Sequence, residues 1–170
     1  IALLYDTLSA LGLSSLTVKL GSVGDPQDRA AYNDYLRSEL ADRSEELTPT
    51  SQERLRLNPM RLLDAKDPQD RALIDPLRKP LDFIGADARA PFDEVRSWLS
   101  AWDVPFLIDP SLVRGLDYYR RTAFEIDHGG IGAQATISGG GRYDGLVESL
   151  GGPATAGIGW AFGVERVLDA

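Results

Sequence analysis

The stretch from Gly157 to Arg166 reads Gly-Ile-Gly-Trp-Ala-Phe-Gly-Val-Glu-Arg, so small and large side chains alternate along it. Successive side chains of a β-strand point to opposite faces. The alternation predicts a strand over 158–162 with one face of nearly bare backbone, formed by Gly157, Gly159, Ala161 and Gly163. The other face is expected to pack against the core through Ile158, Trp160, Phe162 and Val164.

A strand face without side chains has two physical explanations. Glycine weakens a strand, so repeated glycine on one side indicates a close approach, either by a flat ligand or by another backbone or helix. Arg166 follows at the end of the strand, where a planar cation could cover an adenine ring or bind a phosphate. The alternative for Arg166 is a surface ion pair with the neighbouring Glu165.

Two further motifs combine glycine with polar or aromatic side chains. Residues 138–145 read Ser-Gly-Gly-Gly-Arg-Tyr-Asp-Gly and are interpreted as a turn entering a short helix at 143–150, which suits an anion or is a plain hairpin turn. The segment lacks the Lys-Ser/Thr of a Walker loop and the spacing of the dinucleotide fingerprint. Residues 112–119 bring Arg114, Asp117 and the tyrosines Tyr118 and Tyr119 together, either as an aromatic ligand wall or as a structural ion pair with packed rings.

The chain divides by character into a strand-bearing part and a helical part. An apolar stripe at 1–11 predicts a helix that Gly12 ends, and alternation predicts a strand over 16–22. The charged stretch 25–104 is helix-like, and the string Asp-Pro-Gln-Asp-Arg-Ala, which begins at Asp25 and again at Asp67, predicts two helix starts. The further predicted helices are 50–57, 59–65 and 88–101, and the further predicted strands are 106–108, 123–126 and 135–138. Residues 1–24 and 105–170 are therefore expected to form one core, and 25–104 an insertion.

Composition restricts the classes of function. The 170 residues carry 18 basic and 26 acidic side chains, a net charge of −8, so a nucleic-acid partner would need a local basic patch. The chain has no cysteine, which fits a reducing cytosol, and its single histidine, His128, is expected in a turn and makes a zinc site improbable. No apolar run is long enough for a membrane span.

Three segments together resemble the histidyl-tRNA synthetase family. Residues 112–125 resemble the family's histidine-binding signature, 140–146 its glycine-rich segment, and 157–167 motif 3 of class II synthetases. The string at 112–119 is highly specific, whereas motif 3 is shared across the class. The resemblance implies an α+β fold: part of the class II synthetase antiparallel-sheet catalytic core, interrupted by an all-helical insertion domain.

The same resemblance assigns roles to individual residues. It implies that Arg114 is catalytic and contacts the histidine carboxylate and the α-phosphate. It implies that Tyr118, Tyr119 and Tyr143 bind histidine. The ATP-binding residues that it implies are Arg166, Gly157, Gly159, Gly163 and, more weakly, Glu125.

The implied reaction is the ATP-dependent activation of L-histidine, with Mg²⁺ accompanying ATP, followed by transfer to tRNA(His). The implied parent is a cytoplasmic homodimer, and the insertion would lie against the tRNA acceptor arm. The chain is interpreted as an internal fragment, inactive alone, because motifs 1 and 2, the acidic imidazole-recognising residue and the anticodon-binding domain are not found. The alternatives are a non-catalytic relative (the ATP phosphoribosyltransferase regulatory subunit or a tRNA-sensing pseudo-synthetase) and a generic nucleotide-binding module.

Overall fold

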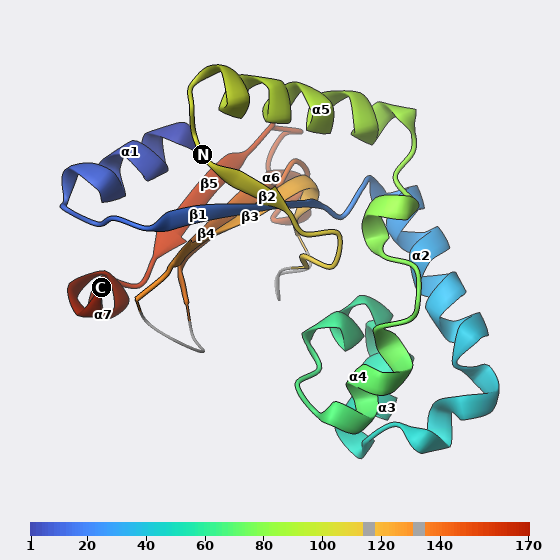
Figure 1. Ribbon diagram of the computed structural model, residues 1–170. Helices are drawn as coiled ribbons and strands as arrows, with labels where there is room; N and C mark the ends of the chain where they lie inside the picture. The colour runs from blue at the N-terminus through green and yellow to red at the C-terminus, as the bar shows by residue number, and fades with distance from the viewer. Residues whose placement is uncertain (114–117, 131–134) are drawn as a thin grey trace.

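A five-stranded sheet forms the centre of the protein (Figure 1). The computed structural model describes residues 1–113, 118–130 and 135–170. The sheet has the order β2-β1-β3-β4-β5. Its strands are β1 (Leu16–Ser22), β2 (Phe106–Ile108), β3 (Arg120–His128), β4 (Thr136–Arg142) and β5 (Ile158–Phe162).

The sheet is mixed, which corrects the expectation of an antiparallel sheet. β2 pairs in parallel with β1, with Val18 opposite Phe106, whereas the other neighbouring strands are antiparallel. Parallel neighbours need a long crossover connection. Here residues 23–105 connect β1 to β2, and this crossover contains the whole helical segment.

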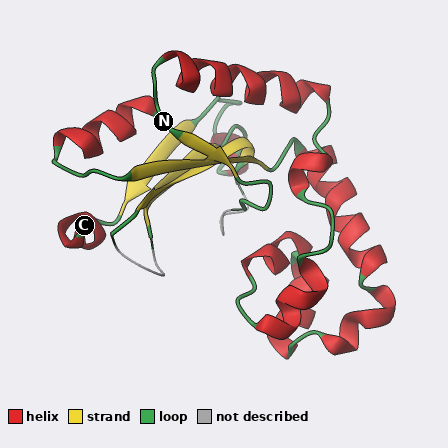
Figure 2. Cartoon of the chain, viewed as in Figure 1, coloured by secondary structure: helices red, strands yellow, loops and turns green. Residues whose placement is uncertain are grey.

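Two helices cover one face of the sheet, α1 (Ala2–Ala10) and α5 (Ala86–Ala101) (Figure 2). Leu4 and Leu8 of α1 are fully buried, and Phe92 of α5 is 1% exposed. These side chains share one cluster with residues of the sheet: Leu16, Val18, Leu20, Phe124, Ile126 and Ile137. The helix predicted over 88–101 is thus confirmed, and Trp98 in this helix is 52% exposed.

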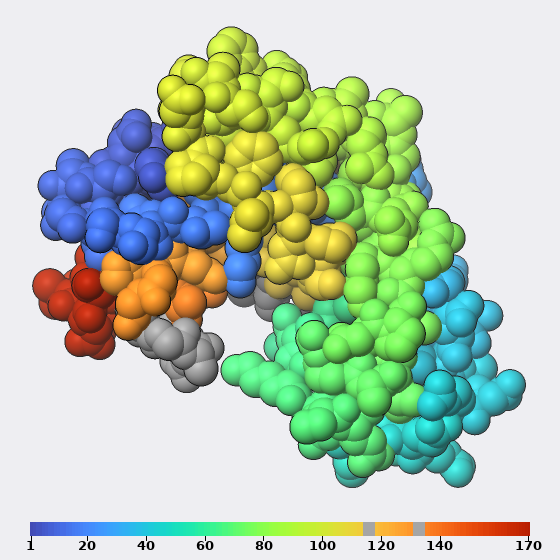
Figure 3. All heavy atoms as spheres, in the orientation of Figure 1, coloured from blue at the N-terminus to red at the C-terminus, as the bar shows by residue number. Residues whose placement is uncertain are grey.

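The helices of residues 26–82 form a separate lobe beside the sheet (Figure 1 and Figure 3). They are α2 (Pro26–Glu39), η1 (Ala41–Glu46), α3 (Pro49–Leu57), η2 (Pro59–Asp64), α4 (Pro68–Ile74) and η3 (Pro80–Asp82). Residues 25–104 contain no strand. The segment predicted as a helix over 59–65 is a 3₁₀-helix. Both copies of the string Asp-Pro-Gln-Asp-Arg-Ala begin helices, at Asp25 and Asp67.

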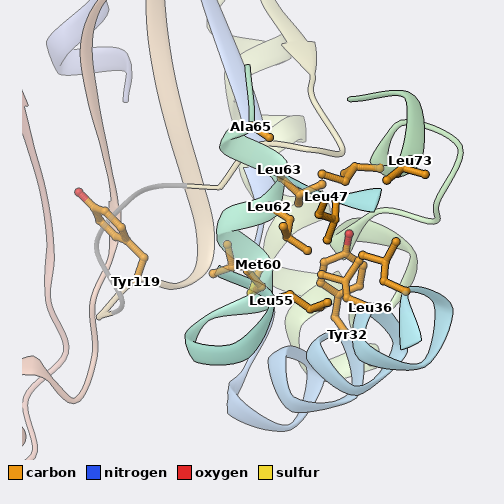
Figure 4. Packing of buried hydrophobic residues seen from close by; sticks show 13 residues of the cluster. Tyr32, Leu36, Leu47, Leu55, Met60, Leu62, Leu63, Ala65, Leu73 and Tyr119 are labelled. Carbon is orange, nitrogen blue, oxygen red and sulfur yellow. The ribbon is translucent and has the colours of Figure 1, made fainter. Parts of the chain in front are cut away.

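The lobe has its own apolar core, which Figure 4 shows around Tyr32, Leu36 and Leu62. Tyr119 lies at the margin of this cluster, on the side of the sheet (Figure 4). One carboxylate is also buried in the lobe, that of Asp70, which is 2% exposed. It accepts hydrogen bonds from the Thr48 amide, the Thr48 hydroxyl and the Ser51 hydroxyl at 2.8, 2.7 and 2.6 Å.

The junction between sheet and lobe is held by polar contacts. Gly24 has φ +69°, a conformation that glycine adopts without a steric penalty. Arg121 pairs with Asp25, with Nε 3.1 Å from Oδ1. Arg29 of α2 donates a hydrogen bond of 3.2 Å to the carbonyl of Tyr119. The position of α2 is therefore tied directly to the start of β3.

Candidate functional site

The face of the sheet opposite α1 and α5 carries most of the predicted site residues. Phe124 and Ile126 of β3 point to the helices, so Glu125 and Asp127 point to the other face, called the open face below. Glu125 pairs with Gly139, Gly139 with Ala161, and Gly141 with Gly159. This part of the open face is therefore almost free of side chains from β4 and β5.

The glycine triplet 139–141 belongs to strand β4, so its interpretation as a turn that enters a helix was wrong. The helix starts later, as α6 (Leu146–Ser149), after Gly145 with φ +89°. These strand positions are glycine because neighbouring groups lie too close for a side chain. A Cβ on Gly141 would lie 2.8 Å from the ring of Tyr119, and one on Gly140 would lie 2.8 Å from Cα of Trp160.

Two tyrosines lie against these bare strands. A Cβ on Gly157 would come within 2.5 Å of the Tyr143 ring, and one on Gly159 within 2.7 Å of the Tyr143 hydroxyl. The ring centroid of Tyr118 lies 5.0 Å from that of Tyr119 and 5.9 Å from that of Tyr143. The structure thus brings the three tyrosines together, and Tyr143 itself covers part of the strand face that we expected to be bare.

The position of Tyr143 is fixed by its neighbours in sequence and space. Its amide donates to the carbonyl of Gly157 at 2.8 Å, and the Gly157 amide donates to Asp144 Oδ1 at 2.9 Å. Partial burial raises the pKa of Asp144, but the hydrogen bonds from Arg142 and Gly157 outweigh it, so the pKa lies below its ordinary value. Asp144 is therefore an ionised anchor between the glycine-rich segment and β5.

Charged side chains line the open face farther from the tyrosines. Lys19 Nζ lies 2.7 Å from Asp127, and Thr136 donates to Asp127 at 2.7 Å and to Glu125 at 3.3 Å. The hydrogen bond with Asp127 raises the pKa of Lys19, although burial opposes this. The sequence alone does not single out Lys19, Asp127 or Thr136, because alternation over 16–22 indicates only that Lys19 lies on the polar face of that strand.

Arg166 lies at the end of β5 farthest from Tyr143, on α7 (Val164–Asp169). Its Nη1 donates to the Thr136 carbonyl at 2.6 Å. A cavity of about 370 Å³ opens there, lined by Thr136, Gly139, Ala161, Gly163, Arg166 and other residues of β4 and β5. The buried hydroxyl of Ser138, also in this lining, has no hydrogen-bond partner among the described residues.

The expectation that Ile158, Trp160, Phe162 and Val164 pack in the core was wrong. Their exposed fractions are 68%, 43%, 40% and 56%. Trp160 lies opposite Gly140 and Phe162 opposite Ser138, so both share the face of Phe124 and Ile126. They remain exposed because β5 is the edge strand of the sheet, and the main core cluster contains no β5 residue.

Two other expectations have different outcomes. Arg114, the predicted catalytic residue, lies outside the described residues, as does Asp117. His128 is not a turn residue but the last residue of β3, 7% exposed, and its Nδ1 accepts a hydrogen bond from the Gly130 amide.

A sheet with helices on one face, and tyrosines and a cation around bare strands on the other, fits the catalytic core of a class II aminoacyl-tRNA synthetase. Comparison with known proteins identifies the family. A family model described as histidyl-tRNA synthetase matches residues 1–167. The chain belongs to the histidyl-tRNA synthetase family.

Individual relatives agree with this assignment. The chain is 57% identical to a histidine–tRNA ligase of Thermus thermophilus and 53% identical to one of Deinococcus deserti, with 100% of this chain covered in both cases. An S. aureus histidyl-tRNA synthetase structure matches 98% of the chain with a TM-score of 0.75 and 35% identity. The chain spans 41%, 39% and 40% of the lengths of these three proteins.

A weaker likeness concerns the fold alone. A Bacillus halodurans protein described as an ATP phosphoribosyltransferase regulatory subunit/histidyl-tRNA synthetase matches 99% of this chain and 47% of its own, with a TM-score of 0.59 and 23% identity.

Among the described residues, no helix is both long and apolar enough to cross a bilayer.

Proposed function

We propose that this chain provides the histidine-binding and part of the ATP-binding surface of a histidine–tRNA ligase. The observation that carries the proposal is the convergence of Tyr119 and Tyr143 on the glycine backbones of β4 and β5. The imidazole would lie beside these rings, where tyrosine hydroxyls and glycine backbone groups can bond its nitrogen atoms. The 57% identity to a histidine–tRNA ligase over the whole chain supports this substrate.

We place ATP along the open face between Tyr143 and Arg166. Gly159 and Gly163 are four residues apart, which is about 13 Å at ~3.3 Å per strand residue. That span has room for an adenylate whose phosphate lies toward the tyrosines and whose purine meets the guanidinium of Arg166. Gly157 would make room for the ring of Tyr143 at one end of the nucleotide, Gly163 would keep the other end clear, and Glu125 would border the nucleotide.

Arg114 completes the proposed reaction. A guanidinium beside the histidine carboxylate and the α-phosphate would stabilise the charge that develops as the adenylate forms. No group of three or more His, Cys, Asp or Glu side chains in the described ranges is placed to hold a metal ion. Mg²⁺ therefore belongs to the proposal only as the ion that accompanies ATP.

The remaining parts of the proposal concern organisation. Residues 1–24 and 105–170 would form the catalytic core, and 25–104 an insertion that meets the acceptor arm of tRNA(His). The lobe of α2–α4 would carry that contact, while α5 packs on the sheet. The working protein would be a cytoplasmic homodimer of the relatives' length, and the 170 residues alone would not catalyse.

The test uses Arg114→Ala in the full-length protein carrying this sequence, with Arg96→Ala in α5 as the matched control. Loss of one such charge-stabilising group costs ~10²–10³ in rate. We expect that loss in histidine-dependent ATP–pyrophosphate exchange and in tRNA(His) aminoacylation, and no change for the control. Normal aminoacylation by Arg114→Ala removes Arg114 from the mechanism, and activity with another amino acid but not with histidine overturns the substrate.

A further inference from the structure

A second cleft lies at the junction of α2, the start of β3 and α6, and its volume is about 550 Å³. It shares no lining residue with the cavity beside Arg166. The polar and aromatic side chains that line it are Arg29, Asn33, Tyr118, Arg120, Asp144 and Ser149. It is therefore a separate site, on the Tyr118 side of the tyrosine group.

Two polar side chains of this cleft have an atom or group without a hydrogen-bond partner among the described residues. The Asn33 Oδ1 atom is buried and has no hydrogen-bond partner in the described part of the chain. An unmade hydrogen bond at a buried acceptor costs free energy, so such a group needs an explanation. A ligand that donates a hydrogen bond to Asn33 from within the cleft would provide one.

Arg120 is the second such group. Arg120 pairs with Arg142 in the β3–β4 ladder, but within residues 1–113, 118–130 and 135–170 its side chain makes no hydrogen bond or ion pair. Its guanidinium rests against Gly145, where a Cβ would lie 2.9 Å from Nη2. The absence of a side chain at Gly145 thus makes room for a guanidinium without a partner, and a planar fork of this kind matches the oxygen atoms of a phosphate.

The rest of the lining determines which anion fits. Tyr118 is 37% exposed and offers an aromatic face. Arg29 adds a second positive charge, although it already donates to the Tyr119 carbonyl. The only carboxylate among the described lining residues is that of Asp144, which is bonded by Arg142 and the Gly157 amide. The cleft therefore combines net positive charge with a stacking surface and a hydrogen-bond acceptor.

We propose that this cleft binds a 5′-phosphorylated nucleotide at the single-stranded end of an RNA. Arg120 holds the phosphate, Tyr118 stacks on the base, and Asn33 accepts a hydrogen bond from an exocyclic amine or a ribose hydroxyl. The inference rests on the proposed function for the identity of the RNA, the acceptor end of tRNA. The overall charge of −8 makes such a local basic site necessary for RNA contact.

The location supports an RNA end rather than a distant stretch of RNA. The ring of Tyr118 contacts those of Tyr119 and Tyr143, so the cleft adjoins the proposed histidine slot. A nucleotide held there places the following residues of the strand within reach of the activated amino acid. The same cleft borders α2, so the helical lobe and the core hold the RNA together.

The test measures binding of the trinucleotide 5′-pCpCpA-3′, the sequence that ends tRNA acceptor strands, to the full-length protein carrying this sequence by calorimetry. We expect Arg120→Gln to weaken binding at least tenfold, Arg120→Lys about threefold, and Asn33→Ala about threefold. Arg37→Gln, an exposed arginine on the same helix paired with Asp34, is the matched control and leaves binding unchanged. Removing the 5′-phosphate has the same effect as Arg120→Gln, and the two changes together add nothing.

Each outcome decides the inference. Equal binding of 5′-pCpCpA-3′ by the chain and by Arg120→Gln overturns it, as does no binding at all. Equal affinity for AMP that is lost in Arg120→Gln assigns the cleft to a free nucleotide and also overturns it. Circular dichroism shows whether each variant is folded. If Arg120→Gln does not fold, Arg120→Lys still tests the inference. Histidine binding by the same samples is independent: histidine without RNA binding refutes only this site, and RNA without histidine binding refutes only the proposed function.

Discussion

Asp28 in α2 accepts a hydrogen bond of 3.1 Å from the amide of Gly85, 57 positions later, and its other oxygen accepts one of 2.9 Å from the amide of Asp25. One carboxylate thus binds the chain both where it leaves the sheet for the helical lobe and where it returns. The lobe is held at its base by this contact, by the Arg121–Asp25 ion pair and by the bond from Arg29 to Tyr119.

Removing that carboxylate should loosen the base of the lobe. Asp28→Ala leaves two backbone amides without their partner, and we expect a loss of ~1–3 kcal/mol in the free energy of unfolding. Hydrogen exchange at Asp25 and Gly85 should quicken. The control Asp34→Ala removes an exposed carboxylate of the same helix that pairs only with Arg37. Unchanged exchange at Gly85 in Asp28→Ala would show that the contact does not hold the lobe.

Asp70 should make the lobe sensitive to acid. Burial raises its pKa, but hydrogen bonds from Ser51 and Thr48 outweigh this and lower the pKa below its ordinary value. A lowered pKa stabilises the fold above the unfolded pKa of ~4, and this stabilisation is lost as the pH falls through the folded pKa.

Asp70→Asn should therefore cost ~1–3 kcal/mol at neutral pH and flatten the decline in stability below pH ~4. Urea unfolding at neutral and acid pH measures both effects. Glu53→Gln, on the surface of α3, is the control and should leave the unfolding midpoint unchanged. A decline as steep in Asp70→Asn as in the natural chain would assign the acid sensitivity to other carboxylates.

Alanine substitutions at Gly157 and Gly159 should respond differently when the hydroxyl group of Tyr143 is removed. A Cβ on Gly159 lies too close only to the Tyr143 hydroxyl, at 2.7 Å, with ring atoms at 3.3 Å and beyond, whereas a Cβ on Gly157 meets the ring itself at 2.5 Å. Each alanine substitution alone should cost ~1–3 kcal/mol because it overpacks the contact. Tyr143→Phe should restore stability to Gly159→Ala but not to Gly157→Ala. Equal rescue of both would mean that Tyr143 does not lie as described.

Tyr32 offers a test at alkaline pH. It is 1% exposed, its hydroxyl donates to the Arg78 carbonyl at 3.0 Å, and burial raises its pKa. A raised pKa stabilises the fold below the unfolded pKa of ~10, and this is lost as the pH rises beyond it. Tyr32→Phe should cost ~1 kcal/mol at pH 8 and less at pH 11. Tyr5→Phe on α1 is the control, and a Tyr32→Phe deficit that grew with pH would contradict the assignment.

The sequence predicted those features that depend on local periodicity. The strand over 16–22, the strand over 158–162 and the helix starts at Asp25 and Asp67 agree with the structure, because alternation and capping residues act over a few positions. The parallel pairing of β2 was not predictable from such patterns, since it depends on the path of the chain through the whole lobe.

The site shows the same limit. Alternation predicted which β5 side chains share a face, but not that the apolar face lies at an edge beyond the helices, where Trp160 stays exposed. Composition indicated a turn at 139–141, yet these glycines are strand residues. They lack side chains because Tyr119 and the Trp160 backbone lie close to them. The contact between Tyr143 and Gly157 joins positions 14 residues apart, and no local pattern encodes it.

The exposed row of Ile158, Trp160 and Phe162 on β5 has a practical consequence. Edge strands offer unpaired backbone groups to other chains, and apolar side chains beside such an edge favour association. Solutions of the 170-residue chain should therefore form non-native aggregates at high concentration. A lysine in place of Ile158, which is 68% exposed, would be the simplest way to keep the chain dispersed.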